Sequence, residues 1–472
     1  MNLISFNFLI FFVCVSIAYY LIQRFWFKKN INQIFLLLAS LVFYSFSNIK
    51  FLPFLIFLFL VTYGFSFIVQ KNNFLFVLSI LIEILPLLFF KYVNFIISPF
   101  TTHKLNIFLP LGISFITFQC LSYLIDIKKG KIILEKNPIT VFLFISFFPT
   151  ISSGPIQRAE NLIPQLKERH LFDYDNATSG MKLFAWGFFK KVLIADSLAT
   201  YVNLIYKSPA DYYGCAVLLA TVFYSFQIYC DFSGYSDMAI GISKFLGFDM
   251  GKNFDHPYLS KSCSEFWKRW HISLSSWLKD YIYIPLGGSR VALPRIYLNL
   301  MITFLVSGIW HGAAWTFVIW GVIHGIYQCI GRALKSFNEK IPGWIRICFT
   351  FCLITFAWIF FRAESVKDCF TIIKKISLIP NELINQIPDF LKSYGIKNTV
   401  KHFFSINMSQ CKTILVLIAF IAIEITTFKK DGLLIIGSKK LSIRWILYIF
   451  FVIFIYVNLP MQINNDFVYF NF

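Results

Sequence analysis

Two histidines lie in strongly apolar segments of this sequence, and histidine is the side chain best suited to proton transfer near neutral pH. His311 follows Trp310 in a run of small and aromatic residues, 307–315, inside the apolar stretch 299–331. That stretch exceeds the roughly 20 residues of one membrane-spanning helix, so we expect a break or a close helix approach at the histidine. An ionisable residue inside a membrane is a candidate for function, although a hydrogen-bonded packing histidine is the alternative. His324 faces another side of the helix and is expected to be structural.

The second histidine lies in a segment, 263–286, whose aromatic and aliphatic residues recur at helical spacing. The pattern predicts one amphipathic helix that lies at the membrane interface or dips into the bundle. His271 and Trp270 fall on its apolar face, and Arg269 falls on its polar face. Taken alone, His271 is interpreted as a packing residue.

A third polar cluster, 227–237, interrupts another apolar region. Buried carboxylates and hydroxyls need partners, so this cluster either orients histidines, lines a polar tunnel or forms a structural hydrogen-bond network. Its candidate residues are Asp231, Ser233, Tyr235 and Asp237.

The elements that must position these residues are membrane helices. Hydrophobic residues make up 58% of the chain and charged residues only 14%, far from the composition of a soluble domain. Apolar runs long enough to cross a bilayer recur throughout, which predicts an all-α, polytopic transmembrane bundle. We divide the sequence into N-terminal helices (1–100), a core that holds the polar clusters (101–362), a polar excursion (363–411) and C-terminal helices with a tail (412–472).

The net charge of +20 comes from short basic loops between apolar runs, such as 24–29, 128–136, 158–169 and 429–444. This is the positive-inside pattern, and it is favoured over nucleic-acid binding. It places both termini outside the cytoplasm and predicts about ten to twelve crossings, some of them only re-entrant. The ten cysteines contain no C-x-x-C pair, so we expect buried thiols and no metal centre.

Five segments together resemble the membrane-bound O-acyltransferase family: 110–115, 153–158, 229–241, 267–277 and 307–315. The resemblance is closest to its bacterial envelope branch, which includes alginate O-acetyltransferase (AlgI), peptidoglycan O-acetyltransferase (PatA) and teichoic-acid D-alanyltransferase (DltB). It implies that His311 is the catalytic histidine in a tunnel that joins the two membrane faces, and that His271 supports it. Candidate tunnel-lining residues are then Asp231, Ser233, Tyr235, Asp237, Arg269, Trp270 and Trp310.

The C-terminal residues 467–470, Phe-Val-Tyr-Phe, match a Phe-x-Tyr-Phe motif of the alginate-type enzymes and of DltX, the small partner of DltB. The resemblance implies that Tyr469 accepts the acyl group covalently. A phenol that a histidine helps to deprotonate is a reasonable nucleophile. The alternative is an aromatic anchor at the membrane interface.

The expected reaction moves acetyl from a cytoplasmic thioester, acetyl-CoA, which is not permanently bound. The acetyl group crosses the bacterial inner membrane and reaches an envelope polysaccharide, peptidoglycan or alginate-like, through a periplasmic partner of the SGNH serine-hydrolase type. A D-alanyl transferase for a teichoic-acid-like polymer is the nearest alternative, and a lipid- or protein-modifying acyltransferase is another. A transporter explains the hydrophobicity, but it predicts internal repeats, which the sequence lacks.

Overall fold

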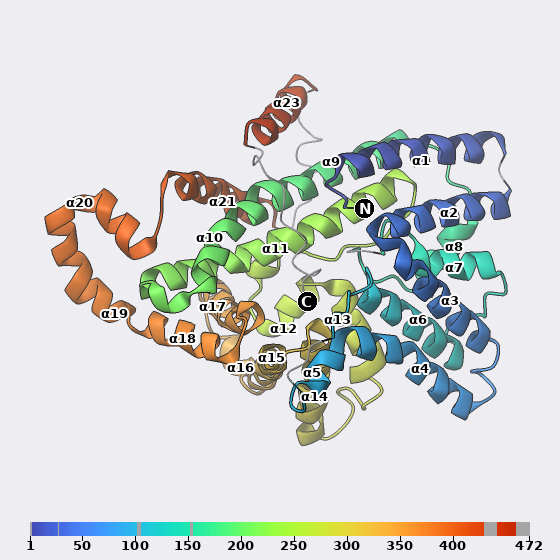
Figure 1. Cartoon of the computed structure of the whole chain (residues 1–472), viewed down its shortest axis with the longest axis horizontal. Helices are drawn as coiled ribbons and strands as arrows, with labels where there is room; N and C mark the ends of the chain where they lie inside the picture. The colour runs from blue at the N-terminus through green and yellow to red at the C-terminus, as the bar shows by residue number, and fades with distance from the viewer. Residues whose placement is uncertain (1, 27, 102–104, 152–153, 429–440, 459–472) are drawn as a thin grey trace. The chain divides into compact units, whose positions relative to one another are not determined.

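The computed structural model describes residues 2–26, 28–101, 105–151, 154–428 and 441–458. These residues form helices joined by loops, with no strand among them, which confirms the all-α prediction (Figure 1). In the part of the chain that the structure describes, seven helical segments are long and apolar enough to cross a membrane: Phe6–Phe25, Ile49–Ser66, Asn73–Ile97, Gly214–Phe245, Leu293–His311, Gly343–Arg362 and Gln410–Thr427. Two shorter apolar helices, Asn30–Phe46 and Ser442–Val457, add to them. The chain is therefore a multi-pass membrane protein.

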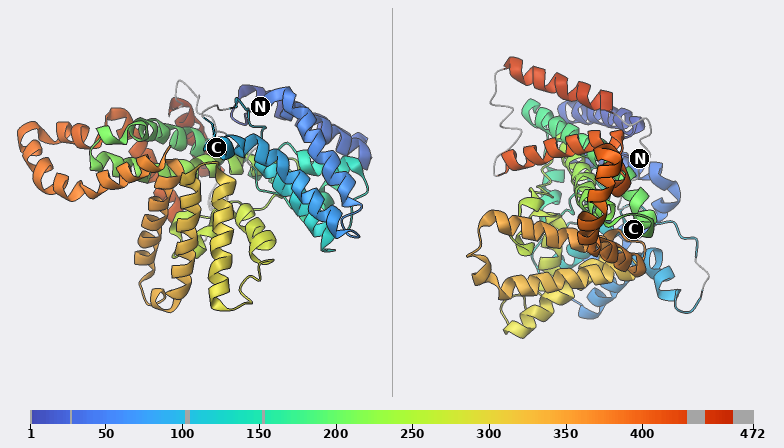
Figure 2. Two further views of the ribbon diagram at one scale, coloured as in Figure 1. Left: turned by 60° about the horizontal axis from the view of Figure 1, so that its bottom comes forward. Right: turned by 90° about the vertical axis from the view of Figure 1, so that its left-hand side faces the viewer.

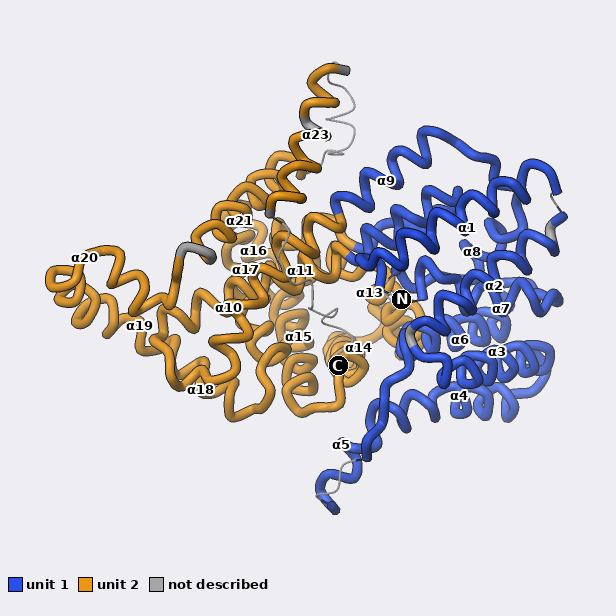
Figure 3. Tube along the Cα trace, turned by 45° about the horizontal axis from the view of Figure 1, so that its top comes forward, with its two compact units in different colours: residues 1–186, 235–253 blue, residues 187–234, 254–472 orange. Residues whose placement is uncertain are grey.

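The chain forms two compact units, drawn in different colours in Figure 3. Unit 1 comprises Met1–Trp186 and Tyr235–Asn253, and unit 2 comprises Gly187–Gly234 and Phe254–Phe472. Helices α9 (Tyr174–Phe189) and α11 (Gly214–Phe245) each contribute residues to both units. The division into four sequence segments stays a prediction.

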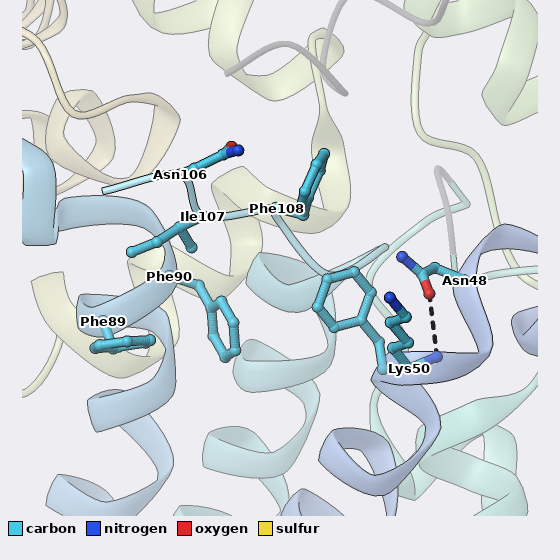
Figure 4. A pocket seen from close by; sticks show the side chains of 8 residues that line it. Asn48, Lys50, Phe89, Phe90, Asn106, Ile107 and Phe108 are labelled. Carbon is cyan, nitrogen blue, oxygen red and sulfur yellow. Dashed lines mark hydrogen bonds between the residues drawn. The ribbon is translucent and has the colours of Figure 1, made fainter. Parts of the chain in front are cut away.

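Unit 1 is built from the N-terminal helices, in which α6 packs against α3 and α4, and α2 packs against α7. Its helices are α1 (Phe6–Phe25), α2 (Lys29–Asn48), α3 (Leu52–Ser66), α4 (Asn73–Leu87), α5 (Val93–Ile97), α6 (Ile113–Lys128), α7 (Pro138–Ser146) and α8 (Ala159–Lys167). At the end of α2, an open pocket of about 450 Å³ is lined by Phe51 and the seven residues labelled in Figure 4. None of the sequence-predicted site residues lines this pocket.

Unit 2 carries both candidate histidines. Helices α14, α15 and α17 run side by side in it (Figure 2), with α12 packed on α15. Its helices are α10 (Asp196–Lys207), α12 (Cys263–Arg269), α13 (Ile272–Leu278), α14 (Leu293–His311), α15 (Trp315–Ala333), α17 (Gly343–Arg362), α18 (Val366–Ser377), α20 (Ile387–Phe404), α21 (Met408–Thr427) and α23 (Leu441–Asn458). A π-helical turn, η3 (Lys190–Ala195), precedes α10.

The polar excursion is tied to the long helix α11. The carboxylate of Glu382, which is buried, accepts hydrogen bonds from the backbone N–H groups of Gly214 (2.7 Å) and Cys215 (3.0 Å). A carboxylate at this position pairs backbone donors that a helix N-terminus leaves open and also suits the helix dipole. The predicted excursion, 363–411, is therefore mostly helical and anchored at the start of α11.

Candidate functional site

The over-long apolar stretch folds as a helical hairpin that breaks at His311. Helix α14 ends at this histidine, Gly312 is extended, and α15 begins at Trp315. The two helices approach so closely that a Cβ on Gly308 would lie 2.4 Å from the carbonyl oxygen of Phe317. Glycine is therefore required at this crossing, and both the predicted break and the predicted close approach are present.

The side chain of His311 is buried among aromatic rings. Its ring centroid lies 4.9 Å from that of Trp310, 5.0 Å from Trp320 and 5.2 Å from Phe361. The neutral imidazole is the form of histidine that acts as a base.

The prediction of one continuous helix over 263–286 was wrong, because the chain breaks at Trp270 and His271. Helix α12 ends at Arg269 and α13 starts at Ile272. His271 adopts a left-handed backbone conformation (φ 44°, ψ 56°), which is uncommon for a residue with a side chain. The predicted apolar face is nevertheless buried on both sides of the break, as expected from its periodicity: Phe266, Trp267, Trp270, His271, Leu274, Trp277 and Leu278.

The break turns His271 toward the hairpin. Its buried ring lies 4.6 Å from Phe232 of α11 and 6.2 Å from Trp310, measured between ring centroids. Trp310 in turn contacts His311, so one indole lies against both histidines. His271, Trp310 and His311 are thus brought together, although 40 positions separate the two histidines in the sequence.

Two polar residues of α11, Asp231 and Ser233, pair with two lysines of η3. The Nζ atom of Lys191 lies 2.6 Å from the carboxylate of Asp231 and 2.8 Å from that of Asp196. Lys190 donates a hydrogen bond to the hydroxyl of Ser233 (2.8 Å). All of these side chains are buried.

Neither lysine was predicted from the sequence as a site residue. Two adjacent lysines between apolar residues could have drawn attention, because intramembrane cations are rare and usually paired. Their place on a π-helical turn is a second sign, since such turns occur often at functional sites and are visible only in the structure.

The remaining predicted site residues lie in other surroundings. Trp270 is buried and packs on Phe254 and Phe266, with ring centroids 5.1 and 5.4 Å away. Arg269 points elsewhere, because it forms ion pairs with Asp255 and Glu265, each at 3.0 Å.

Two further candidates, Tyr235 and Asp237, belong to unit 1. There the hydroxyl of Tyr235 donates to the side-chain oxygen of Asn2 (2.9 Å), and Asp237 is half-buried. Tyr469 lies outside the described residues.

Comparisons with known proteins identify the family. Residues 133–364, which include both histidines, match the model of the membrane-bound O-acyltransferase family. A peptidoglycan O-acetyltransferase of Helicobacter pylori is 35% identical over 400 residues, which cover 76% of each chain.

Two other relatives match over shorter ranges. A probable alginate O-acetylase AlgI of Azotobacter vinelandii is 42% identical over 300 residues, which cover 61% of this chain and 60% of that protein. A teichoic acid D-alanyltransferase of Bacillus subtilis is 31% identical over 323 residues, which cover 62% of this chain and 80% of that protein.

The match to this family model, together with a relative that is 35% identical over 76% of each chain, shows that the chain is an acyltransferase and belongs to the membrane-bound O-acyltransferase family.

Proposed function

We propose that this acyltransferase moves acetyl groups from cytoplasmic acetyl-CoA to a polysaccharide of the cell envelope. Two kinds of relative support acetyl as the group transferred, because the peptidoglycan and alginate enzymes match at 35% and 42% identity. The observation that carries the proposal is the burial of His311, with His271 nearby, at a break between membrane helices.

The chemistry follows from the ring-lined site. His311 takes the proton of an acceptor hydroxyl, whose oxygen attacks the thioester carbonyl carbon. The C–S bond then breaks, and the thiolate takes the proton back from His311. The products are an ester and a free thiol, and the histidine is returned to its starting form. His271 supports this site through the indole of Trp310, which it shares with His311.

A membrane site solves a transport problem for the cell. Coenzyme A is highly charged and cannot cross the hydrocarbon layer, whereas an acetyl group passed between hydroxyls can cross within the protein. We place the enzyme in the bacterial inner membrane with both termini outside the cytoplasm. The outgoing acetyl group is then received by a periplasmic partner of the SGNH serine-hydrolase type, which transfers it to the polymer.

We assign the acceptor hydroxyl to Tyr469 in the C-terminal Phe-x-Tyr-Phe motif. A phenyl ester is more activated than an alkyl ester, so transfer from Tyr469 to a serine or sugar hydroxyl runs downhill. Replacement of Tyr469 by phenylalanine removes only this hydroxyl and keeps the ring that an interfacial anchor needs. Tyr469→Phe should therefore abolish polymer acetylation, and full acetylation by this variant would rule out the carrier role.

The function is tested by mass spectrometry of envelope polysaccharide from three strains: wild type, a deletion, and the deletion complemented with His311→Ala. The proposal expects acetyl esters in the first strain and none in the other two. Unchanged acetylation in the deletion strain would overturn it. The teichoic-acid relative makes D-alanine the second candidate, and the same spectra separate the two because D-alanyl and acetyl esters differ in mass.

A further inference from the structure

A third buried histidine, His324, lies one helical turn after Trp320 on α15. Its ring centroid is 4.6 Å from that of Trp320 and 5.1 Å from that of Trp267. Trp320 is the same indole that lies 5.0 Å from His311. The single ring of Trp320 therefore contacts both His311 and His324.

A hydrogen bond determines the chemical form of His324. The indole nitrogen of Trp267 lies 3.2 Å from Nδ1 of His324. An indole N–H can only donate, so Nδ1 must accept, and the hydrogen of the neutral ring sits on Nε2. A doubly protonated ring would place its own Nδ1–H against the indole N–H, so this bond requires neutral His324.

The same bond connects two helices that lie next in sequence to the candidate catalytic histidines. Trp267 belongs to α12, which ends two residues before His271, and His324 belongs to α15, which starts after the break at His311. Among the described side chains, this is the one hydrogen bond between α12 and α15. The positions of both helices are therefore coupled at His324.

Stability alone does not explain a histidine at this position. In the part of the chain that the structure describes, Nε2 of His324 is buried without a hydrogen-bond partner. An unpaired buried polar group costs about 1–3 kcal/mol, whereas two apolar side chains of similar shape would be nearly neutral. A buried polar pair of this kind can instead fix one relative orientation of two packed elements.

We propose that His324 is a positioning residue of the acyltransferase site. It holds α12 in place through the hydrogen bond from Trp267, and it keeps the ring of Trp320 packed against His311. This proposal rests on the proposed function, because it concerns the reaction at His311. It predicts that kcat depends on a hydrogen-bond acceptor at the position of Nδ1 of residue 324. Residue size and Nε2 should matter much less.

Two amide residues separate the roles of the two ring nitrogens. In asparagine the amide oxygen is bonded to Cγ, as Nδ1 is in histidine, so His324→Asn keeps an acceptor for Trp267. Glutamine places its amide near the Nε2 position, and leucine keeps bulk without any acceptor. Trp267→Phe removes the donor but keeps an aromatic ring.

The experiment measures thiol release by the protein in lipid nanodiscs as a function of thioester concentration, with acetyl-CoA and with a D-alanyl-loaded carrier protein as substrates and with excess glycerol as the hydroxyl that finally accepts the acyl group. For the thioester that the wild type uses, His324→Leu and Trp267→Phe should each lower kcat by roughly 10- to 100-fold, as expected for misplacement of a reacting group, with little change in KM. The double variant should be no worse than either single variant, because both remove one interaction. His324→Asn should recover at least tenfold in kcat over His324→Leu.

Tyr327→Phe is the matched control, because the ring of Tyr327 also lies against His324 (5.8 Å) without a hydrogen bond to it. This variant should keep wild-type kcat. Wild-type kcat in His324→Leu would overturn the positioning role, and so would better recovery by His324→Gln than by His324→Asn. A fall in melting temperature that parallels kcat in every variant, without recovery by asparagine, would show a purely structural role. A wild type inactive with both thioesters would instead overturn the proposed function, and His324 would then have no reaction to support.

Discussion

Two buried polar regions of unit 2, one around His311 and one around Lys191, differ in the side chains that surround their titratable groups. Around His311, the neighbours are the rings of Trp310, Trp320 and Phe361. Around Lys191, the neighbours are the carboxylates of Asp196 and Asp231. The first region keeps titratable rings in apolar surroundings, whereas the second neutralises its charges by pairing them.

This difference in surroundings predicts that the two regions have different roles, one in the reaction and the other in the stability of the fold. A buried ion pair that loses one partner leaves an uncompensated charge, which destabilises the fold strongly. A neutral histidine among rings can be truncated without leaving a charge behind. We therefore expect substitutions in the first region to affect activity, and substitutions in the second to affect folding.

The largest expected effect is that of His311→Ala on activity. Loss of a general base typically lowers the rate by about 10²–10⁴-fold, and the melting temperature of the purified protein should change little in comparison. Polymer acetylation in cells and thiol release in nanodiscs measure the activity.

The matched control for His311→Ala is His402→Ala, which alters an exposed histidine on α20 and should leave activity intact. Near-normal acetylation by a normally expressed His311→Ala protein would contradict the role of His311.

Breaking the lysine–aspartate pair should lower stability more than activity, which is the reverse of the effect of His311→Ala. Lys191→Met leaves two buried carboxylates without their cation and should cost about 3–5 kcal/mol of stability. The yield of folded protein and its melting temperature should fall, while activity per folded molecule falls less than tenfold.

Addition of Asp231→Leu should restore part of that stability, because it removes one of the two uncompensated charges. If Lys191→Met were fully stable but inactive, the region around Lys191 would take part in the reaction. This result would contradict the distinction between the two regions.

His271 allows activity and stability to be separated at one residue. Both His271→Ala and His271→Gly remove the ring that packs on Trp310, so both should lower thiol release strongly, less completely than His311→Ala. Glycine tolerates the left-handed backbone found here, and alanine does not, so the glycine variant should be more stable by about 1 kcal/mol. Equal melting temperatures of the two variants would argue against strain at this position.

The smallest effect on activity is expected from tags at the chain ends. Their accessibility shows on which side of the membrane the two termini lie. The basic loops predict that both termini lie outside the cytoplasm, so we expect tags before Met1 and after Phe472 to be accessible from the periplasm in intact cells. A cytoplasmic C-terminal tag would place Tyr469 on the wrong side for an outgoing acyl group.

The class of protein and much of the hairpin could be predicted from local patterns of residues. Hydrophobic runs indicate membrane helices because a bilayer leaves few other solutions for the backbone. The break at His311 was visible because an apolar stretch was too long for one span and held small residues at its middle. The buried face of 263–278 followed from helical periodicity, which is a local property.

Which polar groups meet could be learned only from the fold. The left-handed turn at His271 broke a periodic pattern that favoured one helix, and it brought this ring to Trp310. Lys191 and Asp231 meet although they lie 40 positions apart in the sequence, because the packing of η3 on α11 sets their distance. Local sequence patterns fix the faces of helices, but a partner on another helix depends on long-range packing that no local pattern encodes.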